Sequence, residues 1–405
     1  MRVLLTLLYC GLFSIGAAMA EAPRLTLVEL ATSDRAAQPS VAVDPREGFV
    51  LTWQTREEAG AVLHFAVLDE GGRILRRGEI ARGDNWFING ADFPQLAVLD
   101  NGDWVSFWLQ KTAADPYAYA IRLVRSRDRG AHWDAPLTVH DDGTATEHGF
   151  VSLLADGDDR VRAFWLDGRH MAAAQAGHAG HDASERMTLR SAHFGRDGKQ
   201  GEETEIDALT CACCQTDAVR IGERQIVVYR DRTVDEIRDI YRVEHGRAGW
   251  QAPRPLHADG WRINACPVNG PALAVRDGRV AALWPTMASG EMRVQLLADI
   301  DADANVQVIA AGGGELGRVD LAGWHGGWLV TRVVLRDQVP HLVLSELDAD
   351  GRTRSSQDVA ARVGGYPRLA VHGEQALLAW TQAGDASGTH QVRAALLRPS
   401  ASPSD

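Results

Sequence analysis

The chain has 405 residues, of which 45% are hydrophobic and 24% are charged, and its formal net charge is −12. These fractions are typical of a globular protein. Because the chain is acidic and has no run of basic residues, we expect no nucleic acid among its partners.

The first twenty residues have the pattern of a secretory signal peptide. Arg2 gives the positive start, an apolar run follows, and Ala18-Met19-Ala20 supplies the small residues of a cleavage site. The apolar run is short for a membrane anchor, and no charged stop follows it. We therefore expect residues 1–20 to be removed and the mature protein to be periplasmic or extracellular, without a membrane span.

A sequence pattern of two short apolar strands on either side of a tight turn recurs along the rest of the chain. The first copy joins residues 39–43 to residues 49–53 through a turn that contains Gly48. This pattern indicates a β-hairpin. Further copies begin near Pro94, Val151, Asp217, Pro271, Arg318 and Pro367.

Seven copies predict an all-β fold in which residues 21–400 form a single β-propeller of four-stranded blades. Six blades remain an alternative because the copy near Arg318 is degenerate, and a pair of β-sandwiches is a second alternative. The last copy is one strand short at the C-terminus. We predict that residues 25–30 supply this strand and close the ring, which removes the exposed sheet edges. Residues 401–405 are expected to be a disordered tail.

One segment resembles the repeat of a known superfamily. Residues 126–133 fit the pattern Ser-x-Asp-x-Gly-x-x-Trp. This Asp-box is similar to the BNR repeat of the sialidase superfamily, which includes exo-α-sialidases. The resemblance implies a sialidase-like propeller in which the box is structural and lies away from the active face. Catalytic sialidases also carry an Arg-Ile-Pro-like motif, which residues 34–43 lack, and they typically have six blades. The residues of the box are Ser126, Asp128, Gly130 and Trp133.

The residues that could bind a ligand or carry out catalysis are in loops that lie on one side of a propeller. In each blade, the loop before the first strand and the loop after the second strand open on the same side of the ring, which we call the mouth face. These loops carry nearly all of the clustered cysteine, histidine, arginine and acidic residues. We therefore place the functional site at the mouth of the central channel.

Four cysteines follow the signal segment, and all lie in such loops. Three precede the fourth copy and Cys266 precedes the fifth, so adjacent blades bring the two loops together. Two disulfides are one interpretation. A metal site is the other, because thiolates suit copper(I) or zinc; no cofactor is required otherwise. The cysteines are Cys211, Cys213, Cys214 and Cys266, and the further candidate ligands are His170, His178 and His181.

Arginines on the same loops suit an anionic ligand. Arg230 and Arg232 directly follow an apolar strand, and a guanidinium fork matches a carboxylate through two hydrogen bonds. Sialidase-like enzymes hold the carboxylate of the sugar with arginines, so the resemblance implies the same role here. The candidate substrate-binding residues are Arg230, Arg232, Arg318, Arg368, Trp86 and Asn89.

Acidic residues on the mouth face are the candidate catalytic groups. Hydrolysis of a glycosidic bond needs two acidic groups, or a Tyr–Glu pair in sialidases. The candidates are Asp92, Glu147 and Asp217.

The leading hypothesis is an exported, monomeric, sialidase-like propeller, either a glycoside hydrolase or a binder of anionic glycans, whose ligand is a carbohydrate or a small anion. Two alternatives come from other classes. One is a non-catalytic propeller that binds copper or zinc through Cys and His, and the other is a platform for a protein partner.

Overall fold

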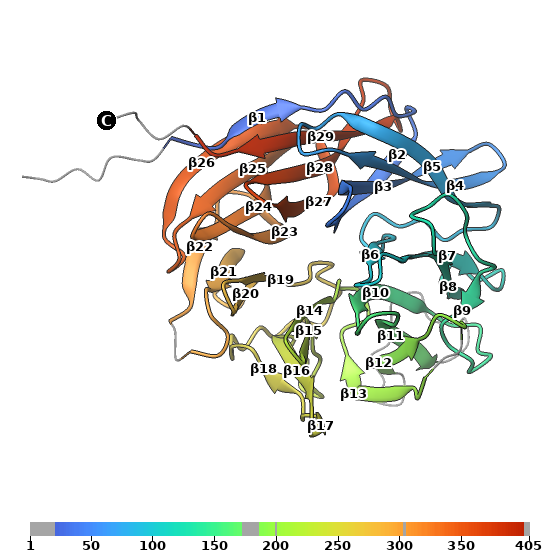
Figure 1. Ribbon diagram of the computed structural model, residues 1–405. Coiled ribbons are helices and arrows are strands. Elements are labelled where there is room, and N and C mark those ends of the chain that lie inside the picture. Colours follow the sequence, from blue (N-terminus) through green and yellow to red (C-terminus); the bar gives the residue numbers. More distant parts are fainter. Residues whose placement is uncertain (1–20, 172–185, 199–200, 303–304, 401–405) are drawn as a thin grey trace, which may run out of the picture.

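The computed structural model describes residues 21–171, 186–198, 201–302 and 305–400. These residues form seven antiparallel sheets that follow one another around a central axis (Figure 1). The prediction of a seven-bladed β-propeller is thereby confirmed, and the degenerate copy near Arg318 forms a complete blade. No helix in the described part of the chain could span a membrane. The expected signal segment and tail lie outside the described residues.

Each blade contains four strands in sequence order, except that blade four has a short fifth strand and the last blade takes its outer strand from the start of the chain. Blade one is β2 (Ala36–Asp44), β3 (Gly48–Glu57), β4 (Gly60–Leu68) and β5 (Ile74–Gly83). Blade two is β6 (Leu96–Val98), β7 (Trp104–Lys111), β8 (Tyr119–Ser126) and β9 (Leu137–Thr138). Blade three is β10 (His148–Ala155), β11 (Val161–His170), β12 (Arg186–Phe194) and β13 (Thr204–Thr210). Blade four is β14 (Asp217–Ile221), β15 (Arg224–Arg230), β16 (Ile240–Gly246) and β17 (Gly249–Trp250), with β18 (Arg254–Pro255) also paired to β16. Blade five is β19 (Ala272–Arg276), β20 (Arg279–Thr286), β21 (Arg293–Leu297) and β22 (Gln307–Ala311). Blade six is β23 (Glu315–Trp324), β24 (Gly327–Arg336), β25 (Val339–Leu347) and β26 (Thr353–Ala361). Blade seven is β27 (Val363–His372), β28 (Gln375–Ala383), β29 (His390–Arg398) and β1 (Arg24–Leu27).

The ring closes through the pairing of β1 with β29, as the sequence predicts. Leu25 lies opposite Leu397 in this antiparallel pair, and Leu25 also packs against the core between blades six and seven. In Figure 1 the blue strand β1 runs beside the red strand β29. Closure pairs the free edge of β29 with the start of the chain, and it fixes both ends of the fold.

The cores lie between neighbouring blades. One core combines Phe107 of β7 with Val161 and Trp165 of β11, so the second strands of blades two and three share it. Trp165 of β11 and Trp284 of β20 are completely buried. Burial of such large side chains is the main source of stability in the fold.

Three buried aspartates connect the first strands of consecutive blades. Each carboxylate accepts a hydrogen bond from a backbone N–H group of the following blade. Such a bond satisfies a backbone donor that the sheet leaves unpaired. The pairs are Asp92 with Phe150 at 2.8 Å, Asp217 with Leu273 at 2.7 Å, and Asp320 with Leu369 at 2.7 Å.

The Asp-box segment forms a tight turn between β8 and β9, on the face opposite the mouth. The Ser126 hydroxyl accepts a hydrogen bond from the Gly130 N–H at 2.6 Å, and the Asp128 carboxylate accepts one from the His132 N–H at 2.8 Å. Gly130 has a φ of 87°, which glycine adopts without strain. Trp133 packs against the core between blades one and two. These hydrogen bonds and this packing hold the turn in shape.

The aspartate contacts between blades predict a specific loss of stability. Replacement of Asp320, which is 3% exposed, in an Asp320→Ala variant leaves the N–H of Leu369 unpaired. We expect the free energy of unfolding in urea to fall by about 1–3 kcal/mol. Asp350→Ala is the control, because that side chain is 68% exposed, and a change within about 0.5 kcal/mol is expected. Equal effects of the two substitutions would contradict the structural role of Asp320.

Candidate metal centre at the mouth of the propeller

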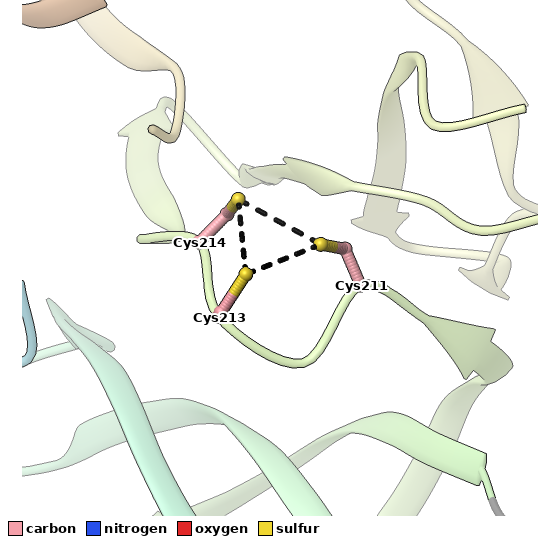
Figure 2. A group of neighbouring side chains, drawn as sticks. All are labelled: Cys211, Cys213 and Cys214. Atoms are coloured by element: carbon pink, nitrogen blue, oxygen red, sulfur yellow. Dashed lines mark hydrogen bonds between the residues drawn. The ribbon is translucent and has the colours of Figure 1, made fainter. Parts of the chain in front are cut away.

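Three thiols meet on the turn that connects β13 to β14 (Figure 2). The Sγ atom of Cys211 lies 3.7 Å from that of Cys213 and 3.7 Å from that of Cys214, and the last two are 4.0 Å apart. The three side chains point toward one another. The turn is short, so the three ligand atoms are held together by local backbone geometry.

Cys266 approaches this group from the next blade. It lies on the loop before β19, and its thiol interacts with those of Cys211 and Cys213. Gly270 makes this approach possible, since a Cβ atom there would lie 2.2 Å from the carbonyl oxygen of Gln215. All four cysteines are free thiols. The structure therefore brings together the four cysteines that the sequence places on adjacent loops, without a disulfide among them.

Burial and charge differ among the four thiols. Cys211 and Cys214 are buried, whereas Cys213 and Cys266 are partly exposed. Hydrogen bonds from the other thiols hold the pKa of Cys211 well below its usual range, and Arg238 adds to this effect. Hydrogen bonds to Cys211 raise the pKa of Cys213 in turn. The cluster therefore favours a thiolate at Cys211, and a thiolate is the form that binds metals.

The Arg238 guanidinium stabilises this thiolate directly. One nitrogen, Nη1, lies 3.4 Å from the Sγ atom of Cys211. Another, Nη2, pairs with Glu236 at 2.7 Å, and the same carboxylate pairs with Arg232 at 2.6 Å. Arg232, a predicted substrate-binding residue, is thus engaged in an ion pair that supports the thiol cluster.

Arg230 stabilises the loop that carries Cys266 through hydrogen bonds. Its side chain is 1% exposed and lies 4.7 Å over the ring of Trp261. It donates hydrogen bonds to the carbonyl oxygens of Arg238 at 2.7 Å, Asn269 at 2.9 Å and Pro285 at 2.9 Å. These carbonyls engage all three guanidinium nitrogens, so the geometry gives this predicted substrate-binding residue a structural position.

Two of the predicted catalytic acids lie in a buried hydrogen-bond network on the mouth face. The Tyr119 hydroxyl donates to Glu147 at 2.7 Å and lies 3.3 Å from the carboxylate of Asp92. Burial raises the pKa of Asp92 to about 7 and that of Glu147 to about 8. Asp92 and the Cys211 thiolate raise the pKa of Glu147 further. These acids therefore hold protons near neutral pH next to the thiol cluster.

The other sequence candidates are distributed over several blades. Asp217 holds the first strand of blade five, and Arg368 lies 3.5 Å from Asp320 and faces the ring of Phe93. Arg318 lies near the hydroxyl of Tyr366.

Trp86 is buried in a stack with Trp108, and the Asn89 side chain accepts a hydrogen bond from the N–H of Ala91. His170 is partly exposed and faces Glu205 at 3.8 Å. His178 and His181 lie outside the described residues.

A second group of titratable side chains, which the sequence did not single out, lies between blades two and three. Asp142 accepts from His148 at 2.8 Å, and the ring of His140 stacks on that of His148 at 3.5 Å. Parallel stacked rings cannot both point an in-plane nitrogen at one ion. Arg169 also lies 3.2 Å from Asp142 and already supplies positive charge. We therefore assign this group to an ion-pair network.

A cavity of about 550 Å³ opens on the mouth face between blades seven and one. The Gln54 amide donates to the Gln38 side chain at 2.7 Å at its wall, and Gln38 has a positive φ of 58°. Three blades contribute to the cavity, so no single sequence motif could reveal it. Its charged and polar lining residues are Arg35, Gln38, Gln54, Arg56, Glu57, Thr381 and His390.

Comparison with known proteins supports the fold. No protein-family model matches the chain, and no curated protein matches it. A solved structure of a protein of unknown function from Dyadobacter fermentans matches 94% of this chain and 100% of its own, with 10% identity and a TM-score of 0.51.

Two enzymes are more distant in structure. An α-L-arabinanase from Penicillium chrysogenum matches 94% of this chain and 99% of its own, with 12% identity and a TM-score of 0.48. The NanB sialidase from Streptococcus pneumoniae matches 90% of this chain and 68% of its own, with 10% identity and a TM-score of 0.42. At these identities the comparisons bear on the propeller fold alone.

The raised pKa of Glu147 predicts a pH dependence of stability. A carboxyl group whose pKa is higher in the folded than in the unfolded chain stabilises the fold at low pH, and this contribution is lost as the pH rises from about 4.5 toward 8. In Glu147→Gln, the free energy of unfolding should therefore fall less between pH 5 and pH 8 than in the wild type. Urea unfolding at the two pH values measures this difference.

Glu223→Gln is the matched control for this measurement, because the side chain of Glu223 is 66% exposed. It should preserve the wild-type pH dependence. If Glu147→Gln also preserved it, the buried acid would not be the cause.

Proposed function

We propose that this propeller is exported and that it binds a thiophilic metal ion, copper(I) or zinc, in the four-cysteine centre on its mouth face. The observation that carries the proposal is the near-equilateral triangle of the Sγ atoms of Cys211, Cys213 and Cys214. These three atoms also form a group of ligand atoms within 4.8 Å of one another.

The size of the triangle suits a single metal ion. Thiolates bind zinc at about 2.3 Å, which places sulfurs in a tetrahedral site about 3.8 Å apart. The measured separations of 3.7, 3.7 and 4.0 Å agree with this value. Thiolate ligands select copper(I) and zinc over harder ions such as magnesium and calcium. The chemistry and the spacing therefore point to the same class of ion.

The surroundings compensate the charge of such a centre. Bound thiolates carry negative charge, and a buried charge is costly unless it is paired. Arg238 touches Cys211; burial raises the pKa of the Cys214 thiol, and the nearby Arg230 opposes that rise. The two guanidinium groups therefore stabilise a thiolate centre, whichever of the two ions it holds.

Metal content tests the proposal. The purified protein should hold one copper or zinc ion per chain when it is loaded anaerobically and measured by elemental analysis. Cys214→Ser should lower the metal content to the background level, because it removes one of the three sulfur ligands. His170→Ala is the control and should bind a full equivalent, since His170 faces Glu205. A wild-type protein that holds no stoichiometric ion after loading would refute the proposal.

A glycan-acting role, of the sialidase-like kind that the sequence suggests, is the second candidate. The cavity between blades seven and one favours it, because Arg35, Arg56 and His390 line a space large enough for a small sugar. The Tyr119–Glu147 pair also has the composition of a sialidase nucleophile and its base. Tyr119, however, is fully buried, so binding in the cavity is better supported than hydrolysis at this pair.

Titration with N-acetylneuraminic acid, followed by calorimetry, tests the second candidate. Arg56→Ala should weaken binding about tenfold, because a charge-assisted hydrogen bond contributes about 1.5 kcal/mol or more. Arg247→Ala, which alters an arginine whose side chain is 86% exposed on the opposite face, should leave binding unchanged. The absence of binding heat from the wild type would exclude this ligand. Release of the fluorophore from a fluorogenic sialoside would indicate that the protein hydrolyses sialosides as well as binding them.

A further inference from the structure

We infer that the ion is copper(I), that the turn of Cys211, Cys213 and Cys214 holds it in three-coordinate form, and that Cys266 is the thiol through which it enters and leaves. This inference rests on the proposed metal-binding function and adds the identity of the ion and its exchange. Its basis is the unequal placement of the four thiols.

The three thiols of the turn are complete as a trigonal site. A triangle with edges of 3.7, 3.7 and 4.0 Å has its centre about 2.2 Å from each corner, which is close to the length of a metal–thiolate bond. An ion at this centre binds all three sulfurs without any movement of the turn. Three thiolates in a plane suit a soft monovalent ion, whereas structural zinc takes four ligands in a tetrahedron.

Cys266 is not the fourth corner of a tetrahedron. A tetrahedral site places all four ligand atoms at similar distances from one another. Cys266 interacts with the thiols of Cys211 and Cys213, but it lies outside the group of ligand atoms that are within 4.8 Å of one another. It therefore flanks one edge of the triangle, where it can bind an ion that is entering or leaving.

Exposure also separates Cys266 from two of the three thiols of the turn, Cys211 and Cys214. Cys211 is 0% and Cys214 is 1% exposed, so these two corners lie at the buried side of the triangle. Cys266 is partly exposed, and the loop around it includes Val268, which is 41% exposed. The loop is held at its end, where Asn269 accepts from Arg230. The thiol can thus reach solvent while the blades stay in place.

The exchange is a ligand substitution and involves no electron transfer. Copper arrives as Cu⁺ on a thiolate carrier, a bond forms from the sulfur of Cys266 to copper, and the bond from copper to the carrier breaks. The Cys266 thiol releases its proton to solvent at this step. Bonds then form from copper to the sulfurs of Cys211, Cys213 and Cys214, and the bond to Cys266 breaks. Cys266 takes a proton back from solvent, and those thiols of the turn that still carry a proton release it to solvent.

The test compares two cysteine variants in the full-length protein, loaded anaerobically with Cu⁺ in acetonitrile. X-ray absorption should show three sulfur neighbours per copper in the wild type and also in Cys266→Ser. Transfer of copper to bathocuproine disulfonate should be at least tenfold slower in Cys266→Ser than in the wild type. Cys214→Ser should lose at least a hundredfold in Cu⁺ affinity. Cys266→Ala serves as a second variant, and urea unfolding confirms that each variant is folded.

The outcomes separate this inference from the proposed function. A wild-type protein that binds zinc through four sulfurs, together with a Cys266→Ser variant that loses its ion as Cys214→Ser does, would keep the metal-binding function and overturn the inference. Equal rates of copper transfer in the wild type and in Cys266→Ser would also overturn it. If no ion binds in stoichiometric amount, the proposed function itself fails.

Discussion

Closure of the ring by β1 is the constraint on which the rest of the structure depends. Without it, β29 would expose a row of unpaired backbone groups and blade seven would lack its outer strand. Closure makes every blade a neighbour of two others, and the cores lie at these boundaries. A loop that precedes a first strand is therefore held against the loop of the next blade. This contact brings Cys266, from the loop before blade five, beside the three cysteines of the loop before blade four.

Polar side chains fix the contact between these two loops. Arg230, at the end of β15, holds the loop of Asn269 through backbone carbonyls, and Arg238 holds Cys211. Buried arginines are costly unless each donor is satisfied, and here carbonyl oxygens, Glu236 and a thiolate satisfy them. The charged groups next to the cysteines thus serve two purposes. They lock adjacent blades together, and they supply the positive charge that a thiolate centre needs.

Acidic residues on the mouth face also take part in the contacts between blades. Asp92 and Asp217 accept backbone N–H groups from the following blade, so their position in the channel serves the assembly of the ring. Glu147 lies in the same buried region and holds a proton near neutral pH. A propeller brings many polar residues to one mouth, and only their contacts distinguish a group that supports the fold from one that meets a ligand.

The sequence by itself determined the architecture of the ring. Alternation of apolar residues around glycine turns is a local property, and seven copies with one missing strand require a closed ring of blades. It also placed the four cysteines on adjacent loops. The tertiary structure alone decided how the side chains are used: it engaged Arg230 with carbonyls, set three sulfurs at the spacing of one ion, left Cys266 beside them, and formed a cavity from three blades. These outcomes depend on distances between residues far apart in the chain, which a linear pattern does not contain.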